Sequence, residues 1–239
     1  MQKKSWYLII AVLIVIAIVV TVVASRLLAR ANLDALESVN SSGANSDLQT
    51  QTYLASNSPT FRNGDKIFGS AEAALKIFVY EDYTSVYSAN LADTLDKIKA
   101  EMGDQAAIIV RPYVVNNLEA AQQLAQAVDC AGEQGKWKEM RALLFAQAKN
   151  KQLLVDNLAN YENQLSLNTS DFTACLTNQT KSGKIEQSVV EAQGYGVQGA
   201  PTMFIGDEMI IGARPYEDFV DSNGDKISGL KSVVAGKIN

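Results

Sequence analysis

The 239-residue sequence contains no histidine and only two cysteines, and these absences exclude several classes of enzyme. A Ser-His-Asp or Cys-His catalytic site needs an imidazole base, so neither site can be built from this chain. A tetrahedral zinc site needs three or four cysteine or histidine ligands at paired spacings, which two distant cysteines cannot provide. The sequence therefore predicts no metal site, and it favours a protein without a cofactor.

An excess of basic charge is also missing. The chain has 21 Lys and Arg against 26 Asp and Glu, which gives a net charge of -5. Residues 1–30 hold four of the basic residues and no acid, so 17 basic and 26 acidic residues remain in the rest, a balance of -9. A domain with this balance repels polyanions, and the sequence therefore predicts no nucleic-acid partner.

A long charge-free run lies near the start of the chain. It extends from Trp6 to Ser25, with Lys3 and Lys4 before it and Arg26 after it. A helix of about 20 residues spans roughly 30 Å, the thickness of the hydrocarbon core of a bilayer. Cleaved signal peptides have shorter apolar regions, of about 7–15 residues. Residues 1–30 are therefore predicted to form a transmembrane signal anchor that contacts the membrane through residues 6–25, with cleavage near Ala24 as the alternative.

The short basic tail before this run favours an N-terminus in the cytoplasm. The rest of the chain is then expected outside the cytoplasm, in the periplasm or at the cell exterior. Residues 31–66 are rich in Ser, Asn, Gln and Thr and predict a flexible polar linker. Residues 67–239 are enough for one domain with a sizeable core.

Hydrophobic patterning in this domain predicts an α/β protein. Residues 75–80 and 106–115 predict strands, and residues 86–101 between them predict an amphipathic helix. Helical stretches follow over about 117–195, one of them beginning at Asp171 with Ser170 as its cap. Residues 202–206 and 209–213 then predict a hairpin around Asp207 and Glu208, and residues 215–220 predict a further helix.

Several local strings indicate a family. Phe68-Gly69-Ser70 precedes the first predicted strand and Glu81-Asp82-Tyr83 follows it; the other strings are Cys130 to Trp137, Phe172 to Leu176, and Gly196 to Thr202. In this order the chain resembles the DsbA-like branch of the thioredoxin superfamily over about residues 65–220. The resemblance implies a thioredoxin-like fold, β-α-β, helical insertion and β-β-α, in which the insertion occupies about 117–195. One N-terminal transmembrane helix is expected to precede it.

The chain departs from this family at the position of its chemistry. After Asp82-Tyr83-Thr84 the family has C-x-x-C, and this chain has Ser85-Val86-Tyr87-Ser88. Thiol–disulfide exchange needs an attacking thiolate and a second thiol, and serine hydroxyls supply neither. The sequence therefore favours a redox-inactive homologue that is not an enzyme. A nucleophilic Ser85 would need a lysine as its base, whereas a helix N-cap is a role that serine fills well.

The resemblance also implies a peptide-binding surface. In the family, the proline that corresponds to Pro201 is cis, and the backbone beside it pairs with extended substrate. Val86, Tyr87, Ala200 and Pro201 are the residues that would form this groove here, an edge-strand mode of recognition that needs no cysteine. We therefore expect a protein or peptide partner in a chaperone-like, scaffolding or assembly role, with a structural subunit of a membrane complex as an alternative.

Cys130 and Cys175 lie 45 residues apart on two predicted helices of the insertion, not in a C-x-x-C arrangement. In an oxidising compartment, two cysteines in one domain most simply form one structural disulfide. Two alternatives stay open at this point. The thiols are free and buried, or they form a redox-active pair that makes the protein a thiol–disulfide oxidoreductase.

Two further patterns match known motifs by spacing alone. Gly194, Gly196 and Gly199 have the spacing of a dinucleotide-binding loop, but a predicted helix precedes them and a strand follows, so no nucleotide is expected. The segment 221–232 begins like a calcium loop. Its sixth and twelfth positions, Lys226 and Ser232, lack the required glycine and glutamate, so a polar surface turn is expected.

Overall fold

The computed structural model describes residues 58–114 and 119–238 of the chain. The predicted anchor and residues 31–57 of the predicted linker lie outside these ranges. No helix within the ranges is long and apolar enough to cross a membrane.

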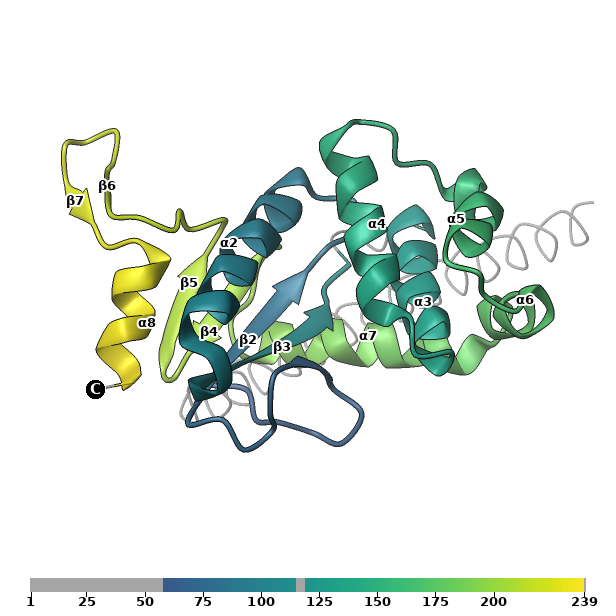
Figure 1. Cartoon of the computed structure of the whole chain (residues 1–239), viewed down its shortest axis with the longest axis horizontal. Coiled ribbons are helices and arrows are strands. Elements are labelled where there is room, and N and C mark those ends of the chain that lie inside the picture. Colours follow the sequence, from purple (N-terminus) through teal and green to yellow (C-terminus); the bar gives the residue numbers. More distant parts are fainter. Residues whose placement is uncertain (1–57, 115–118, 239) are drawn as a thin grey trace, which may run out of the picture. The chain divides into compact units, whose positions relative to one another are not determined.

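A five-stranded sheet forms the centre of the described part, in the strand order β1-β3-β2-β4-β5 (Figure 1). Strand β2 is parallel to β3, whereas β1 is antiparallel to β3, and β4 is antiparallel to both β2 and β5. The strands are β1 (Lys66–Phe68), β2 (Leu75–Glu81), β3 (Ala106–Pro112), β4 (Thr202–Ile205) and β5 (Glu208–Ile211).

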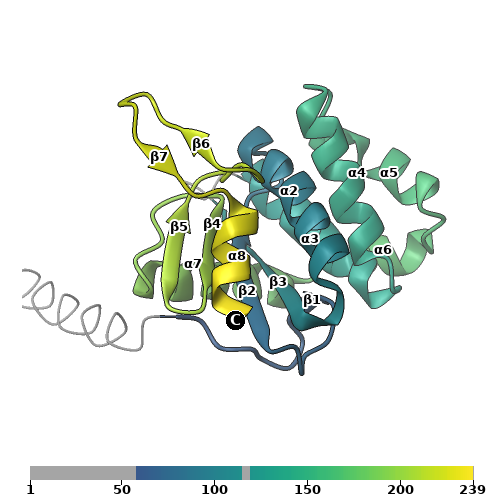
Figure 2. The same cartoon turned by 60° about the vertical axis from the view of Figure 1, so that its left-hand side comes forward.

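Helices cover both faces of this sheet, as Figures 1 and 2 show. Helices α2 (Val86–Met102) and α8 (Leu230–Ile238) lie on one face and α7 (Gln179–Gly194) on the other. Because side chains alternate along a strand, Ile77 and Val79 of β2 pack in the α2–α8 core, and Phe78 and Tyr80 pack toward α7. Burial on both faces explains why β2 and β3 are almost continuously apolar.

A helical subdomain is inserted between β3 and β4. Its helices before α7 are α3 (Glu119–Glu133), α4 (Trp137–Lys149), α5 (Leu158–Gln164) and α6 (Thr169–Leu176). They enclose a second core that includes Leu124, Leu144 and Phe172. Tyr83, which follows β2, also packs into this core and so links the insertion to the sheet. The predicted thioredoxin-like fold, with its helical insertion, is confirmed.

The structure also corrects three local predictions. Asn168, not Ser170, caps α6, because its side chain accepts a hydrogen bond from the Asp171 amide at 3.0 Å. The hairpin turn lies at residues 206–207, one position earlier than predicted. The predicted strand over 106–115 ends at Pro112.

The predicted helix over 215–220 is wrong. Residues 219–220 form strand β6 (Phe219–Val220), which pairs with β7 (Lys226–Ile227). The carbonyls of Pro215 and Tyr216 accept hydrogen bonds from the first two amides of α8, at 2.8 and 3.1 Å, so they are not available to a helix of their own. In the turn between β6 and β7, the Asp221 carboxylate accepts hydrogen bonds from the amides of Asn223 and Asp225.

Candidate functional site

The N-terminus of α2 forms the first wall of the candidate site. Ser85 has an extended backbone, and its Oγ accepts a hydrogen bond from the Ser88 amide at 3.2 Å. Ser85 is therefore the N-cap of α2. The Ser88 side chain is buried, and its Oγ accepts a hydrogen bond from the Asp82 amide at 3.2 Å. Both hydroxyls thus hold the strand-to-helix turn together.

The two residues between these serines face solvent. Tyr87 is 66% exposed and Val86 is 42% exposed, although both are apolar residues at the start of a helix. Neighbouring Asp82 is buried, and its Oδ1 accepts hydrogen bonds from the amide and the hydroxyl of Thr84 at 2.7 and 2.6 Å. The turn is therefore rigidly bonded, while it presents an aromatic and an aliphatic side chain outward.

The loop before β4 forms the second wall. The antiparallel pairing of Tyr80 with Thr202 places this loop beside the end of β2, where the α2 turn begins. The Ala200–Pro201 peptide bond is cis, and the Pro201 carbonyl accepts a hydrogen bond from the Gly212 amide at 2.8 Å. Within residues 58–114 and 119–238, neither the backbone amide nor the backbone carbonyl of Ala200 makes a hydrogen bond.

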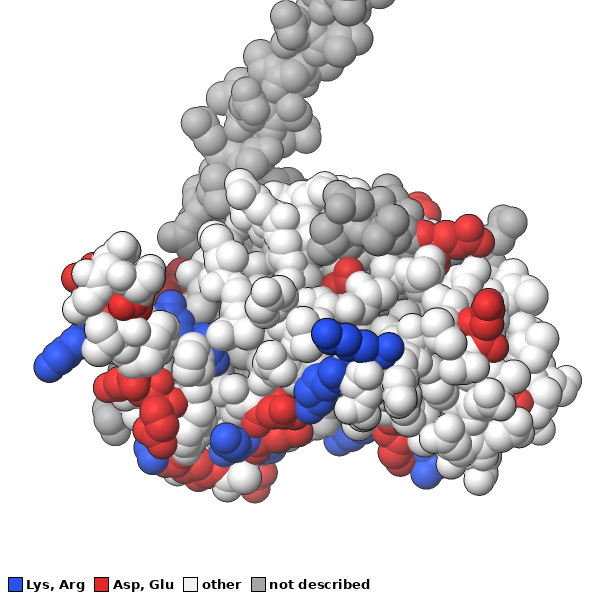
Figure 3. All heavy atoms as spheres, turned by 90° about the horizontal axis from the view of Figure 1, so that it is seen from above, with Lys and Arg blue, Asp and Glu red and all other residues white. Residues whose placement is uncertain are grey.

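The surface at this end of the sheet carries little charge. Figure 3 views the molecule from above Figure 1, the side on which α2 begins. Uncharged atoms make up most of the described surface in the upper middle of that view, a group of blue side chains lies near its centre, and other blue and red side chains lie toward its lower half and its sides. The arrangement suits contact with an uncharged segment better than binding of an ion.

A buried ion pair lies directly behind the α2 turn. The guanidinium of Arg141, on α4, donates two hydrogen bonds of 2.8 Å to the two carboxylate oxygens of Glu81 at the end of β2. Glu81 is 1% exposed and Arg141 is 5% exposed. Burial opposes the charge on Arg141, but Glu81 outweighs burial and raises the pKa of the guanidinium. Burial, followed by the charge of Glu81, raises the pKa of the Tyr83 phenol well above its usual value.

Sequence reasoning missed this pair. Arg141 stands four residues after Trp137 and three before Leu144, a spacing that places it on the apolar side of α4. A charged residue at such a position is a signal that a buried partner exists. Sequence alone did not name Glu81 as that partner, because 60 residues separate the two in the chain.

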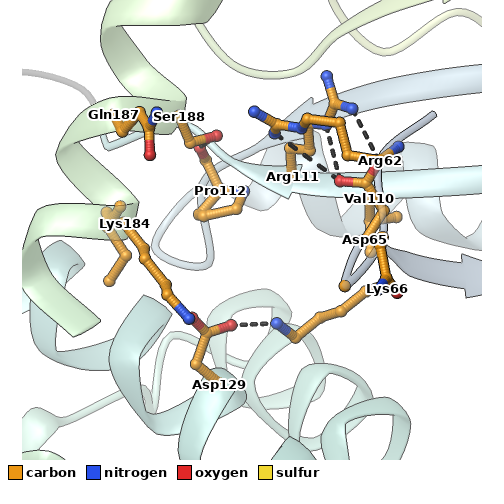
Figure 4. Close-up of a pocket in the computed structure, with 13 residues that line it drawn as sticks. Arg62, Asp65, Lys66, Val110, Arg111, Pro112, Asp129, Lys184, Gln187 and Ser188 are labelled. Atoms are coloured by element: carbon orange, nitrogen blue, oxygen red, sulfur yellow. Dashed lines mark hydrogen bonds and ion pairs between the residues drawn. The ribbon is translucent and has the colours of Figure 1, made fainter. Parts of the chain in front are cut away.

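The pocket in Figure 4 is a second candidate site. It has a volume of about 350 Å³ and lies between β1, β3, α3 and α7. All five N–H groups of Arg111 are used: two bond to Asp65, one to the carbonyl of Thr60, and the rest to the Tyr80 hydroxyl and Glu191.

The other charges of this pocket are largely paired as well. Arg62 pairs with Glu191 at 2.7 Å, Lys66 pairs with Asp129, and Lys184 reaches from α7 toward Asp129 (Figure 4). Since carboxylates of the chain already hold these cations, we assign the pocket a structural role. The ion pair of Arg111 with Asp65 and the pairing of β1 hold the segment of residues 58–66 in place. The last part of the predicted linker is therefore bound to the domain.

The two cysteines form a disulfide, as predicted. Cys130 on α3 and Cys175 on α6 have a Cα–Cα distance of 5.7 Å, and their side chains are 1% and 7% exposed. Gln126, one turn before Cys130, donates to the carbonyls of Leu176 and Asn178 at 2.7 and 3.2 Å. The bond therefore lies inside the helical insertion, on elements other than those that carry Ser85 and Ser88.

Solved structures with a similar fold include a thiol-disulfide exchange protein. The thiol-disulfide exchange protein alpha-DsbA2 from Wolbachia pipientis matches with a TM-score of 0.62 and 12% identity, over 82% of this chain and 96% of that one. BdbD from Bacillus subtilis matches with a TM-score of 0.63 and 14% identity, over 77% of this chain and 97% of that one. At these identities the likeness shows the fold alone.

Curated relatives are larger proteins. A segment of 147 residues is 26% identical to the Na(+)/H(+) antiporter NhaA 3 of Salinispora tropica, and covers 62% of this chain and 22% of that protein. An NhaA antiporter of Herminiimonas arsenicoxydans is 25% identical over 151 residues, 23% of its length. The chain thus spans less than a quarter of the relatives it matches. The sequence profile of the thioredoxin family matches residues 62–222. With its fold shared by DsbA-like exchange proteins, the chain belongs to the thioredoxin family.

Proposed function

We propose that this protein is a redox-inactive, DsbA-like member of the thioredoxin family that binds extended segments of a protein partner. One observation carries the proposal. Ser85 and Ser88 occupy the thiol positions as hydrogen-bonded residues of a helix cap. Val86 and Tyr87 between them are exposed, and the backbone amide and carbonyl of Ala200 make no hydrogen bond within the described residues. The role is that of a chaperone, a scaffold or an assembly factor, held at the outer side of a membrane by residues 6–25.

The chemistry supports the loss of exchange activity. A mixed disulfide forms when a thiolate attacks sulfur, and a second thiol resolves it. The Oγ atoms of Ser85 and Ser88 are alcohols that already accept backbone hydrogen bonds. Each of the two remaining sulfurs belongs to a disulfide that is almost fully buried, so an external thiolate has poor access to it. This burial argues against an oxidoreductase that acts through Cys130 and Cys175.

The proposed contact with the partner follows from the geometry. An extended segment beside Pro201 can pair with the free amide and carbonyl of Ala200, in the manner of an added strand. Tyr87 provides an exposed aromatic ring in the first turn of α2, which follows the end of β2 beside which this loop lies. Because the surrounding surface carries little charge (Figure 3), uncharged apolar segments are the favoured partners.

Restoring the thiols tests the assignment of the site. In the double variant Ser85→Cys with Ser88→Cys, we expect the two thiols to close to a disulfide under mild oxidant. We expect the reduced dithiol form to catalyse the reduction of insulin by an added thiol reductant, whereas the wild-type protein does neither. The thiol at position 85 would receive an amide hydrogen bond at the positive end of α2, so its pKa is expected below the free value of about 8.5. Thiolate absorbance against pH and an insulin-reduction assay measure both effects. An unshifted thiol that fails to close would contradict the placement of the site.

Removing the exposed ring tests the binding surface. Tyr87→Ala is expected to weaken binding to immobilised uncharged apolar peptides by about tenfold, the loss expected for an aromatic anchor worth roughly 1.4 kcal/mol. Val190→Ala is the matched control, because Val190 on α7 is 67% exposed and lies outside the proposed groove. Equal losses in both variants, or full binding by Tyr87→Ala, would exclude the groove. Wild-type protein that binds none of the peptides would count against peptide binding but not against the absence of redox activity.

A further inference from the structure

We propose that two copies of this chain pair through strand β5, edge to edge and antiparallel, to form one continuous sheet. Strand β5 is the outer strand of the sheet on the side away from β1, and no described segment pairs with its free edge (Figure 2). Two of its four side chains are exposed hydrophobic residues, Met209 at 38% and Ile211 at 66%. Natural edge strands usually carry charge or other protection at such positions.

The hydrogen-bond pattern shows which backbone groups are free. The opposed pairs of β4 and β5 are Ile205–Glu208, Phe204–Met209, Met203–Ile210 and Thr202–Ile211, and the Gly212 amide donates to the Pro201 carbonyl at 2.8 Å. This bond sets the phase of the ladder, so Met203–Ile210 and Ile205–Glu208 are the hydrogen-bonded pairs. Because hydrogen-bonded pairs alternate with non-bonded pairs in an antiparallel ladder, Met209 and Ile211 direct their N–H and C=O groups away from β4. Four backbone groups therefore line the free edge at the same two residues whose side chains are exposed.

These groups are complementary to a second copy of themselves. An antiparallel partner with its two-fold axis at Ile210 places Met209 opposite Ile211 of the second copy, and Ile211 opposite Met209. Both pairs are then hydrogen-bonded pairs, so all four groups are satisfied. The four Met and Ile side chains form one apolar stripe on a single face of the joined sheet.

Charge favours the same arrangement. Asp207 and Glu208 stand at the beginning of β5, and Arg214 stands shortly after its end. Lys237 of α8 pairs with Asp207 at 3.0 Å and lies 3.9 Å from Glu208, so two carboxylates against one lysine leave this end of the strand with a net negative charge. In the antiparallel pair, the acidic end of one strand faces the basic end of its partner, whereas a parallel pair would align like charges. A strand from an unrelated peptide carries no such matched ends, and this favours a second copy as the occupant.

Site-specific cross-linking of the full chain in detergent tests the register. Met209→Cys and Ile211→Cys, mixed as two separate proteins, are expected to give a disulfide-linked dimer, because paired residues lie about 5.5 Å apart at their Cα atoms. Either variant alone offsets its two new thiols by two positions along the paired strands, a diagonal too long for a disulfide, and is expected to stay monomeric on a non-reducing gel. The proposed pairing would be overturned if each variant alone cross-linked as strongly as the mixture, or if the mixture gave no cross-linked dimer.

A second set of variants tests the association itself. Ile211→Pro removes an N–H that β4 does not use, and Ile211→Lys sets a charge into the apolar stripe, so each is expected to weaken dimerisation at least about tenfold. Val190→Lys is the control, because Val190 on α7 is an equally exposed apolar residue. This variant should leave dimerisation unchanged. Sedimentation over a dilution series in matched detergent measures the effect. A wild-type protein that is monomeric at every concentration, or equal weakening of dimerisation by all three variants, would overturn the proposal. Binding of a peptide, instead of a second copy, along the free edge of β5 would overturn it as well.

Discussion

Replacing Arg141 with methionine is expected to lower the free energy of unfolding by about 3–5 kcal/mol. The change leaves the Glu81 carboxylate, which is 1% exposed, without the two 2.8 Å hydrogen bonds that neutralise it. A buried charge without a partner bears the full cost of its lost hydration, whereas the intact pair contributes little net stability. The effect should also reach the α2 turn, since Glu81 immediately precedes Asp82 and the Glu81 carbonyl accepts a hydrogen bond from Tyr113.

Denaturant unfolding of the variants measures this cost. The double variant Glu81→Met with Arg141→Met should recover most of the stability, because it removes both charges and leaves apolar groups of similar size. Lys149→Met is the matched control on the same helix. Lys149 pairs with Asp93 at 2.8 Å, but both side chains are partly exposed, so its loss is expected to cost at most about 1 kcal/mol. Equal costs for Arg141→Met and Lys149→Met, or no recovery in the double variant, would contradict the argument.

Sequence patterning predicted well those elements whose hydrophobic pattern depends only on how the element itself is buried. Strand β2 and helix α2 begin within one residue of the predicted positions, because an apolar run and an amphipathic period are direct consequences of how each element packs. The predicted helix over 215–220 failed for the opposite reason. Its backbone carbonyls cap α8, which starts 15 residues after Pro215, and no local pattern reveals a partner that lies outside the segment.

The candidate site shows the same division. The serine cap of α2 was predictable, because Ser85 precedes an amphipathic helix and serine satisfies free amides there. The neighbourhood of Ser85 and Pro201 was reached only through the family resemblance. It depends on β4 pairing with β2, across the whole helical insertion. The Glu81–Arg141 pair depends on the packing of α4 against the end of the sheet, and two residues 60 positions apart leave no periodic signal.

Removal of the Cys130–Cys175 bond is the second change with a large expected effect. The bond closes a 45-residue separation, and on the chain-entropy estimate it stabilises the domain by about 4 kcal/mol. The double variant Cys130→Ala with Cys175→Ala should therefore unfold at markedly lower denaturant concentration. Both sulfurs are buried in the core of the insertion, between α3 and α6, so some of the loss would also come from packing.

The same variant separates a structural bond from a redox-active one. A structural bond predicts that peptide binding at the α2 edge persists wherever the variant is folded, because Ser85, Tyr87 and Ala200 belong to other elements. Reduction of the wild-type protein should lower its stability by a similar amount, and the variant should show no further loss under reductant. Binding that disappears while the unfolding free energy stays unchanged would point instead to chemistry at the two sulfurs. In that case the oxidised pair, and not the groove beside Pro201, would be the functional centre of the domain.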